Sequence, residues 1–477
     1  MLSWAKPHRS PAALAETLCD WWITTRHLAF ISDLIIKTIF DPTAPKRLMV
    51  LVPPRHGKST LISQYLPAWY LDLFPERSVI LTSYEGTFAG KWGGRVRDTI
   101  ESNPALFRIR VRQDMSARHM WELEPKCTDG SPAGGGMITA GVAGPVTGQG
   151  GDLVIIDDPH KNLKEVRSQV YRDGAWDWYR GTLRDRFEPD AVVICLMQRW
   201  HEDDLGGRII EHAKDGGEEW TIIKLPAIAE EGDPLGREIG EALWPERYPL
   251  EALEALKTTL GSYLFAAKFQ ENPKPAEGVA FKKSDFRYFA QENGYYELGT
   301  PNGVKRVLTE DCWRFQTVDP AATEKQENDY FVLQDWVVTP DRDMLLTDQL
   351  REHAKTTRHK AIMMAAYERS RPDFQAVENK TFGLNIIQEC LEAGLPIKAL
   401  KADTDKFSRS LPLQARYEAG CIYHRKGAPW LDDFEDELLT FPNGAHDDQV
   451  DAAAYAARML PEMNQEIVLL GDWGDSD

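Results

Sequence analysis

The chain has 477 residues, of which 42% are hydrophobic and 27% charged. This composition is typical of a globular protein and excludes an intrinsically disordered one, and the length predicts two domains. The formal net charge of −18 excludes a surface that is basic throughout, although a local basic stripe would still allow contact with nucleic-acid phosphates.

The cysteines and the apolar segments indicate the compartment. The six cysteines form no CxxC pair and have no metal-type spacing, which predicts free thiols in a reducing environment. The N-terminal stretch carries charges too frequently for a signal peptide. No apolar run approaches the roughly 18–20 residues of a membrane span. We therefore expect a soluble cytoplasmic protein.

Short β-branched runs alternate with amphipathic stretches between residues 46 and 205. Four of these runs predict buried strands: RLMVLVP at 47–53, SVILTSY at 78–84, DLVIID at 152–157 and AVVICLM at 191–197. Apolar runs of this kind, separated by helical patterns, are typical of a parallel sheet covered by crossover helices. The first half of the chain is therefore predicted to be an α/β domain.

The first of these runs leads into a loop that resembles a phosphate-binding loop and precedes a helical pattern. In such a loop, backbone N–H groups at the helix start surround the phosphates, Lys58 contacts the β- and γ-phosphates, and Ser59 holds Mg²⁺. The general motif has glycine at position 52, where this chain has Val52. We expect the nucleotide site to consist of Pro54, Arg55, His56, Gly57, Lys58, Ser59 and Thr60.

The run DLVIID ends in two carboxylates, Asp157 and Asp158. Asp157 is placed to hold Mg²⁺ through water, and Asp158 to orient the attacking water. The alternative is that the two carboxylates merely form an acidic turn after a core strand. The phosphate-binding loop upstream favours the catalytic roles. The run AVVICLM leads into Gln198, which fits a sensor of the γ-phosphate as well as a solvated loop.

The composition changes between about residues 243 and 288. The stretch 243–270 predicts a helix, and ENPKPAEGVAF at 271–281 predicts a connector rich in proline and glycine. We place the domain boundary near 272–278. The predicted organisation is a first domain over 1–270, a connector over 271–310, a second domain over 311–460 and an acidic, flexible tail over 461–477.

A second α/β pattern brings three acidic positions. Asp319 ends the predicted strand WRFQTVD, Glu378 lies in the predicted strand FQAVEN, and the cluster HDDQVD opens an alanine-rich helix. Cleavage of a phosphodiester with two metal ions requires carboxylates from separate elements, with the ions roughly 3.5–4 Å apart. The order strand, strand, helix fits a ribonuclease H-like nuclease.

The helix phase leaves the third metal ligand open between Asp448, which we favour slightly, and Asp447. Asp447 and Asp451 lie one turn apart. Acids in a first helical turn also complement the helix dipole, which is the structural alternative for this cluster. Asp329 is more typical of a turn residue than of a metal ligand.

The motifs together resemble the large terminase subunit of tailed bacteriophages. The resemblance rests on PPRHGKST, VIIDDP, QRWHEDDL, LWPERYP, the two acidic strands and FPNGAHDDQVDA, in this order between about His27 and Ala457. In that family no glycine is expected at position 52. Gln149 stands where relatives are expected to carry arginine, and Gln198 where threonine is more usual.

The resemblance implies an N-terminal P-loop ATPase of the ASCE type, which drives double-stranded DNA into a procapsid. It also implies a C-terminal ribonuclease H-like nuclease that cuts the concatemeric genome. The cofactors would be ATP and Mg²⁺, with Mn²⁺ as a substitute in the nuclease site. Carried over to this sequence, Lys58 and Ser59 bind phosphate and Mg²⁺, Arg55 contacts the nucleotide, and Asp157 and Asp158 form the acidic pair. The nuclease ligands fall on Asp319, Glu378 and Asp448 or Asp447.

The resemblance also implies partners: double-stranded DNA, a portal protein, a small terminase subunit and a ring of copies, a pentamer by similarity, with a monomer when free. The place would be the cytoplasm of the infected bacterium, with no membrane contact and no place in the mature virion. The arginine that offsets γ-phosphate charge is predicted to be Arg55, Arg95 or Arg97. Independently of the resemblance, Lys401, Lys406 and Arg409 beside the acidic positions are candidate DNA contacts, although isolated surface charges are more often solvated than bound.

Three other functions are less consistent with the sequence than a packaging ATPase with a nuclease. A helicase or repair translocase fused to a nuclease would need a second translocase domain, which is not evident between Asp204 and Trp313. A non-catalytic scaffold would have no reason to keep both sets of functional residues. An integrase-like nuclease alone would leave the first half of the chain unexplained.

Overall fold

The computed structural model describes residues 6–144, 146, 148, 150–273, 280–320, 330–379, 383–401, 405–444 and 446–460. The chain divides into two compact units, one of Met1–Glu254 with Tyr263–Pro275 and one of Ala255–Ser262 with Ala276–Asp477. Within the described ranges, no helix combines the length and the apolar character that crossing a membrane requires. Position 149 and the tail from 461 onward lie outside those ranges.

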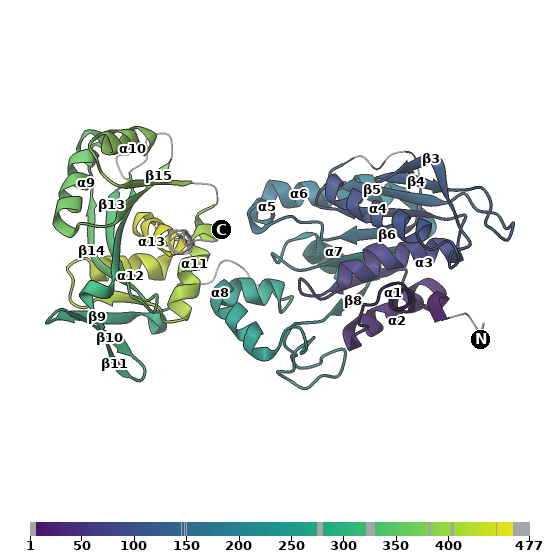
Figure 1. Cartoon of the computed structure of the whole chain (residues 1–477), viewed down its shortest axis with the longest axis horizontal. Helices are drawn as coiled ribbons and strands as arrows, with labels where there is room; N and C mark the ends of the chain where they lie inside the picture. The colour runs from purple at the N-terminus through teal and green to yellow at the C-terminus, as the bar shows by residue number, and fades with distance from the viewer. Residues whose placement is uncertain are drawn as a thin grey trace, which may run out of the picture. The chain divides into compact units, whose positions relative to one another are not determined.

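The first unit is built on an eight-stranded sheet with the order β3-β4-β5-β2-β6-β7-β1-β8 (Figure 1). Every strand pair is parallel except β3–β4 and β4–β5. The strands are β1 (Arg47–Leu51), β2 (Ser78–Ser83), β3 (Val111–Ala117), β4 (Met120–Leu123), β5 (Gly136–Gly141), β6 (Gly151–Asp157), β7 (Phe187–Met197) and β8 (Thr221–Lys224).

Both faces of this sheet are covered, which explains its continuous apolar runs. In β1, Leu48 and Val50 pack on one side, in a core shared with α1, α2, α3 and α4, while Met49 and Leu51 pack on the other, against α6 and α7. Alternate residues of a strand point to opposite faces. The helices are α1 (Pro11–Leu18), α2 (Arg26–Phe40), α3 (Leu66–Leu73), α4 (Gly86–Glu101), α5 (Leu163–Arg167), α6 (Gln169–Trp178) and α7 (Leu205–Lys214).

The strand order fixes the position of the nucleotide site. β7 lies between β1 and β6, the arrangement of an ASCE-type ATPase, in which a strand separates the phosphate loop from the acidic strand. The carboxyl ends of β1, β6 and β7 therefore meet at one edge of the sheet, where ligands bind in open α/β sheets. The predicted α/β fold with a parallel central sheet is confirmed, and the four predicted runs form β1, β2, β6 and β7.

The second unit is built on a nine-stranded sheet with the order β11-β10-β9-β17-β14-β13-β12-β15-β16. In its core β12, β13 and β14 are antiparallel, while β15 and β16 continue parallel to β12. The strands are β9 (Arg287–Glu292), β10 (Tyr295–Thr300), β11 (Gly303–Leu308), β12 (Trp313–Asp319), β13 (Phe331–Val338), β14 (Met344–Glu352), β15 (Phe374–Asn379), β16 (Ile397–Lys401) and β17 (Ile422–Arg425).

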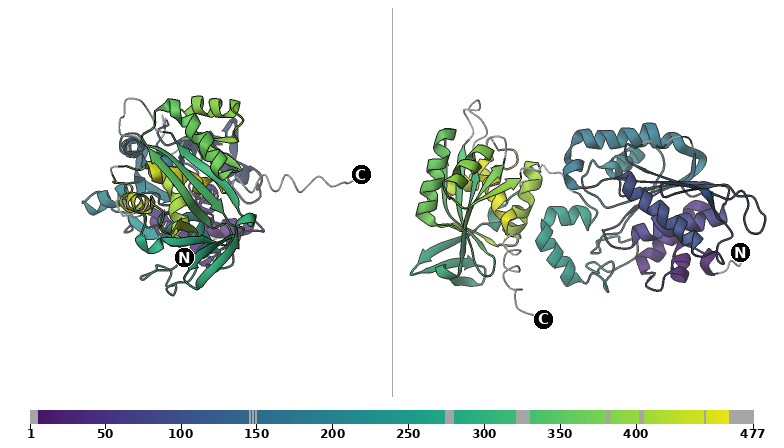
Figure 2. Two further views of the ribbon diagram at one scale, coloured as in Figure 1. Left: turned by 90° about the vertical axis from the view of Figure 1, so that its left-hand side faces the viewer. Right: turned by 45° about the horizontal axis from the view of Figure 1, so that its top comes forward.

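Helices cover both faces of this sheet as well. One face carries α9 and α10 and the other carries α11 and α13, as the green and yellow helices of Figure 2 show. The helices of this unit are α9 (Thr356–Ser370), α10 (Gly383–Glu392), α11 (Lys406–Glu418), α12 (Leu431–Thr440) and α13 (Asp448–Met459), and α8 (Leu250–Lys268) is divided between the two units. The predicted ribonuclease H-like α/β fold is confirmed.

The structure differs from the sequence prediction around the expected connector. The predicted helix over 243–270 begins only at Leu250 and is kinked at Gly261. The range 271–310, predicted to be a connector, contains β9, β10 and β11. These strands carry many polar, exposed residues, so a search for buried apolar runs does not find them. The turn Asn293-Gly294, with both residues at positive φ, is the hairpin signal that marks them in the sequence.

Candidate nucleotide and nuclease sites

The phosphate loop leaves β1 at Leu51 and turns into a helix near Lys58. The helix starts with a π-helical segment, η2 (Thr60–Tyr65), and continues as α3. Arg55 (φ 64°) and Gly57 (φ 83°) have positive φ values, and a Cβ atom at 57 would lie 3.1 Å from Leu28 Cδ1. The tight reversal therefore requires glycine at 57. The predicted strand, loop and helix succession is present.

Lys58 and Ser59 connect the loop to the acidic strand. The buried Lys58 Nζ donates to the Val52 carbonyl at 3.0 Å and lies 3.5 Å from Asp158 Oδ1. Ser59 Oγ donates to Asp157 Oδ1 at 3.0 Å. The two motifs that the sequence singled out, about a hundred residues apart, therefore meet through side-chain contacts.

Asp157 has a second serine partner, which was not among the predicted site residues. Ser63 Oγ, one helical turn beyond Ser59, donates to Asp157 Oδ2 at 2.7 Å. The spacing of four residues is the sequence signal that could have identified it. Burial, followed by the nearby Asp158 carboxylate, raises the pKa of Asp157 to about 7. A cation in this position would therefore be strongly favoured electrostatically.

Asp158 is held by the backbone of β7. Its own N–H donates to the Leu196 carbonyl at 2.9 Å, and its Oδ1 accepts from Gln198 N–H at 3.1 Å. Asp158 has φ 42°, a left-handed conformation that turns its side chain out of the strand direction. Gln198 contributes this contact through its backbone, and its side-chain Oε1 is buried with no hydrogen bond in the described structure.

The imidazole of His56 packs inside the unit. The His56 ring stacks on Tyr248 with centroids 4.9 Å apart, and its Nδ1 lies 2.9 Å from the Pro54 carbonyl oxygen. His27 Nε2 lies 2.9 Å from the His56 carbonyl oxygen. Burial lowers the pKa of each imidazole to about 4. Both rings are therefore neutral at pH 7, and through their contacts with the carbonyls of Pro54 and His56 they stabilise the conformation of the phosphate loop.

A cavity of about 600 Å³ opens beside the phosphate loop. The loop contributes Arg55, Gly57 and Thr60, and the remaining wall comes from the N-terminal segment and from the stretch before α8. These other lining residues are Trp21, Trp22, Ile23, Leu28, Trp244, Glu246 and Arg247. No sequence pattern indicates this aromatic wall, because only the fold brings Trp244 to Trp21 and Trp22.

The three candidate arginines differ in their surroundings. Arg55 is exposed at the rim of this cavity. Arg97 donates to the Ser116 carbonyl at 2.6 Å and to Asp98 at 2.7 Å, so its guanidinium is already engaged. Arg95 is exposed on α4, with its guanidinium 4.7 Å from the centre of the Trp92 ring.

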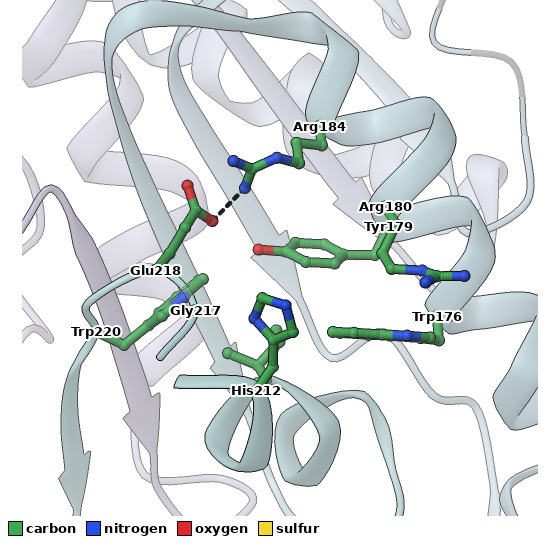
Figure 3. Close-up of a pocket in the computed structure, with 9 residues that line it drawn as sticks. Trp176, Tyr179, Arg180, Arg184, His212, Gly217, Glu218 and Trp220 are labelled. Carbon is green, nitrogen blue, oxygen red and sulfur yellow. Dashed lines mark ion pairs between the residues drawn. The ribbon is translucent and has the colours of Figure 1, made fainter. Parts of the chain in front are cut away.

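A second cavity, of about 450 Å³, lies at the opposite end of the strands (Figure 3). Glu218 in its wall pairs with Arg184 at 2.5 Å and with Arg47, the first residue of β1, at 3.1 Å. The phosphate loop follows the last residue of that strand, roughly 13–17 Å away. This aromatic cavity, with Trp176 stacked on Tyr179, is therefore separate from the nucleotide site.

In the second unit, Asp319 and Glu378 end up side by side. β12 and β15 pair in parallel with Val318 opposite Val377, so the next residues of the two strands are neighbours about 5 Å apart. Val318 and Val377 pack towards α9 and α10. Strand alternation therefore places Asp319 and Glu378 on the other face, towards α11 and α13.

Basic residues of α11 occupy the acidic cluster. Arg409 is buried and donates to Glu378 Oε1 at 2.9 Å, while its Nε lies 3.5 Å from Asp451 Oδ1. Tyr455 also donates to Glu378 Oε1. Lys406 Nζ lies 2.6 Å from Asp447 Oδ1. Arg409, a candidate contact for DNA predicted to lie on the surface, is instead buried, with its charge among carboxylates.

The donor chemistry of this cluster fits Mg²⁺ or Mn²⁺, which prefer carboxylate oxygens. Asp451, one turn after Asp447 in α13, is buried, and this burial raises its pKa to about 7 despite the nearby Arg409. No three acidic, histidine or cysteine residues of the described ranges converge in the arrangement of a metal site. Asp329 lies outside those ranges, and so does the side chain of Lys401.

Two family models match the chain. The model described as "Terminase large subunit, T4likevirus-type, N-terminal" matches residues 49–260, and the model described as "Terminase RNaseH-like domain" matches residues 316–460. Together they cover well over half of the sequence and include both constellations described above. No curated protein sequence matches the chain.

Solved structures of large terminases resemble it. The large terminase of a thermophilic bacteriophage has a TM-score of 0.51 at 10% identity, over 89% of this chain and 98% of its own. The same protein in complex with ADP has a TM-score of 0.49 with the same identity and coverage. The large terminase nuclease from the thermophilic phage G20c with bound cobalt covers 39% of this chain and 98% of its own, at 17% identity and a TM-score of 0.28. On the two family models, this chain belongs to the large terminase subunit family.

Proposed function

We propose residues for the two activities of this large terminase subunit. The subunit hydrolyses ATP to drive double-stranded DNA into a procapsid, and it cuts the concatemeric genome with a metal-dependent endonuclease. The observation that supports the ATPase assignment best is the contact between Ser59 of the phosphate loop and Asp157 of the acidic strand, beside Lys58.

In the ATPase site, each side chain has a separate task. Lys58 exchanges its Val52 carbonyl for the phosphates of ATP, and Ser59 and Asp157 hold Mg²⁺. When bound, Mg²⁺ offsets the charge on the β- and γ-phosphates. Asp158 orients the attacking water, and Gln198 N–H keeps that carboxylate in place. Arg95 is the better donor for a neighbouring subunit, because Arg97 is already paired.

The cavity beside the phosphate loop is our proposed site for the adenine and ribose. It adjoins Gly57 and Thr60, and its aromatic wall offers faces on which a base can stack. Arg55 and Arg247 line the same cavity and supply positive charge close to the phosphates. An aromatic wall beside a cationic phosphate loop is the combination that a nucleotide, with its flat base and its anionic tail, requires.

In the nuclease site, we assign the metal ions to Asp319, Glu378 and Asp448, with Asp447 as the alternative to Asp448. Two divalent ions would there activate a water and stabilise the leaving oxygen. Arg409 and Lys406 hold Glu378 and Asp447 in position through their ion pairs. Because all the assigned ligands are carboxylates, Mg²⁺, with Mn²⁺ as a substitute, is our choice of metal for this chain.

The family also supports the assembly and the place of action. We infer that the subunit works on double-stranded viral DNA with a portal protein and a small terminase subunit, in a pentameric ring during packaging and as a monomer when free. The infected cell's cytoplasm is the compartment, and the mature virion lacks the protein. We keep 1–270 as the proposed limits of the ATPase domain, and we extend the nuclease domain, predicted over 311–460, to include β9, β10 and β11, which belong to its sheet.

Substitution of the phosphate-loop lysine tests the ATPase assignment. Lys58→Ala should abolish DNA-stimulated ATP hydrolysis, because the phosphates lose their side-chain cation, while Mg²⁺- or Mn²⁺-dependent cutting of plasmid DNA persists. Phosphate release and gel analysis of the plasmid, from one preparation, measure both activities.

Asp319→Ala is the matched variant for the nuclease and should have the opposite effect. ATP hydrolysis should continue at the wild-type rate while plasmid cutting is lost. If either substitution removed both activities from a folded protein, the assignment of two independent sites would be wrong.

A further inference from the structure

A buried carboxylate outside every motif borders the nucleotide site. Glu271 follows α8 and is only 3% exposed. It has φ 51°, a left-handed conformation that residues other than glycine rarely adopt. Burial of a carboxylate and a strained backbone both cost free energy, and such features gather at functional sites. The contacts of Glu271 indicate which function this residue serves.

Two consecutive backbone N–H groups bind two carboxylates. Gln198 N–H donates to Asp158 Oδ1 at 3.1 Å, and Arg199 N–H donates to Glu271 Oε2 at 2.8 Å. Consecutive Cα atoms are 3.8 Å apart, so the loop after β7 brings Glu271 next to the water-orienting Asp158. The other oxygen of Glu271, Oε1, is buried with no hydrogen-bond partner in the described part of the chain.

The charges of the nucleotide site act on Glu271. Burial raises its pKa well above the usual range, the Lys58 cation opposes that rise, and the Asp158 carboxylate adds to it. Glutamine keeps the shape of Glu271 and an oxygen that can accept the Arg199 N–H. Aspartate is one methylene shorter and would not reach the Arg199 N–H without a backbone shift.

The neighbours of Glu271 fix it from both sides. The Gln270 side chain accepts from Ile228 N–H at 3.0 Å and donates to the Ile228 carbonyl at 2.9 Å. Arg199 is anchored by its guanidinium, whose Nε donates to Asp204 at 2.9 Å. The chain passes to the second unit at Ala276, five residues after Glu271. The contact therefore links the end of β7 to the segment that leads out of the first unit.

We propose that Glu271 is a positioning residue of the ATPase: it accepts the Arg199 N–H, and this contact fixes the loop whose Gln198 N–H holds Asp158. The proposal rests on the proposed role of Asp158. Because Glu271 lies at the start of the connection between the units, the same contact ties the water-orienting carboxylate to that connection.

Steady-state ATP hydrolysis by the full chain tests this role. Glu271→Ala should lower kcat about tenfold or more, since Asp158 is then misplaced, and leave KM for ATP within about twofold because the phosphate contacts remain. Glu271→Gln, which keeps the acceptor, should retain most of the wild-type kcat, and Glu271→Asp should lose it as Ala does. Plasmid cutting should be unchanged in all three variants.

Glu231→Ala, at an exposed glutamate of the same unit, is the control and should match the wild type. A wild-type kcat for Glu271→Ala would overturn the proposal, as would a kcat for Glu271→Asp above that of Glu271→Gln. If Glu271→Ala fails to fold, the comparison of kcat between Glu271→Gln and Glu271→Asp still tests the proposal. Persistence of ATP hydrolysis in Lys58→Ala would instead overturn the proposed nucleotide site itself.

Discussion

At the scale of single residues, buried polar groups set the shape of the phosphate loop. Lys58 is buried, and its Nζ is satisfied by the Val52 carbonyl. His56 and His27 are completely buried beneath the loop, and each makes a contact with a backbone carbonyl. The loop is therefore held in shape before nucleotide binds, which reduces the ordering that binding requires.

The buried histidines predict a loss of stability in mild acid. The pKa of His27 and of His56 is about 4 in the folded protein against the ordinary value of 6.5. The unfolded chain therefore binds more protons between these values, and stability present above pH 6.5 is lost as the pH falls towards 4. At pH 5 each histidine should cost roughly 2 kcal/mol of unfolding free energy. Calorimetric melting temperatures at pH 7 and pH 5 measure this loss.

His27→Gln removes one of the two titrating groups and should reduce the fall in melting temperature between the two pH values. His119→Gln, at an exposed position, should leave that fall as in the wild type. An identical fall in the wild type and in His27→Gln would show that His27 is not protonated on unfolding.

At the scale of elements, helix α8 is divided between the two units. Its middle part, Ala255–Ser262, groups with the second unit, while the residues before Ala255 and those from Tyr263 onward group with the first. The break falls at Gly261, with φ 77° and ψ 163°. Directly after it, Ser262 donates from its N–H and its Oγ to the two oxygens of Glu418, at 2.8 and 2.6 Å. The kink is therefore stabilised by specific contacts.

Gly261→Ala should destabilise the protein by about 1–3 kcal/mol, because that region of φ and ψ is essentially restricted to glycine. A Cβ atom at 261 would also lie 3.1 Å from Ala415 Cβ. Urea denaturation measures the change. Gly174→Ala is the control: it lies in α6 with nothing within 4 Å of the added Cβ, and it should stabilise by about 0.5–1 kcal/mol. Equal effects of the two substitutions would contradict the interpretation of the kink.

At the scale of the whole molecule, each unit ends central strands of its sheet in carboxylates. The strand that ends in Asp157 could be predicted because its apolar run is continuous. The strand that ends in Asp319, WRFQTVD, could be predicted because it is rich in aromatic and β-branched residues. The proximity of Ser59 and Asp157 could also be predicted, because the phosphate loop and the acidic strand are recognisable motifs. The spacing from Ser59 could have identified Ser63, but Glu271 and the aromatic cavity could not be predicted, because they depend on contacts between segments that carry no shared pattern.

The polar strands show a second limit of prediction from sequence. β9, β10 and β11 form one edge of the nuclease sheet, and their exposed residues give no strong apolar alternation. The neighbouring positions of Asp319 and Glu378 depend on the pairing of β12 with β15, which are separated by β13, β14 and α9 in the chain. A local pattern cannot encode such a pairing, although the order of the acids indicated the nuclease fold.

The central claim is that one chain carries two separate metal-dependent sites for phosphate chemistry. Anomalous diffraction from crystals grown with Mn²⁺ and a non-hydrolysable ATP analogue tests it most directly. We predict manganese at Ser59 and Asp157 in one unit, and between Asp319, Glu378 and Asp448 or Asp447 in the other. Manganese at only one of these places, with the acids of the other bound to protein groups alone, would contradict the claim.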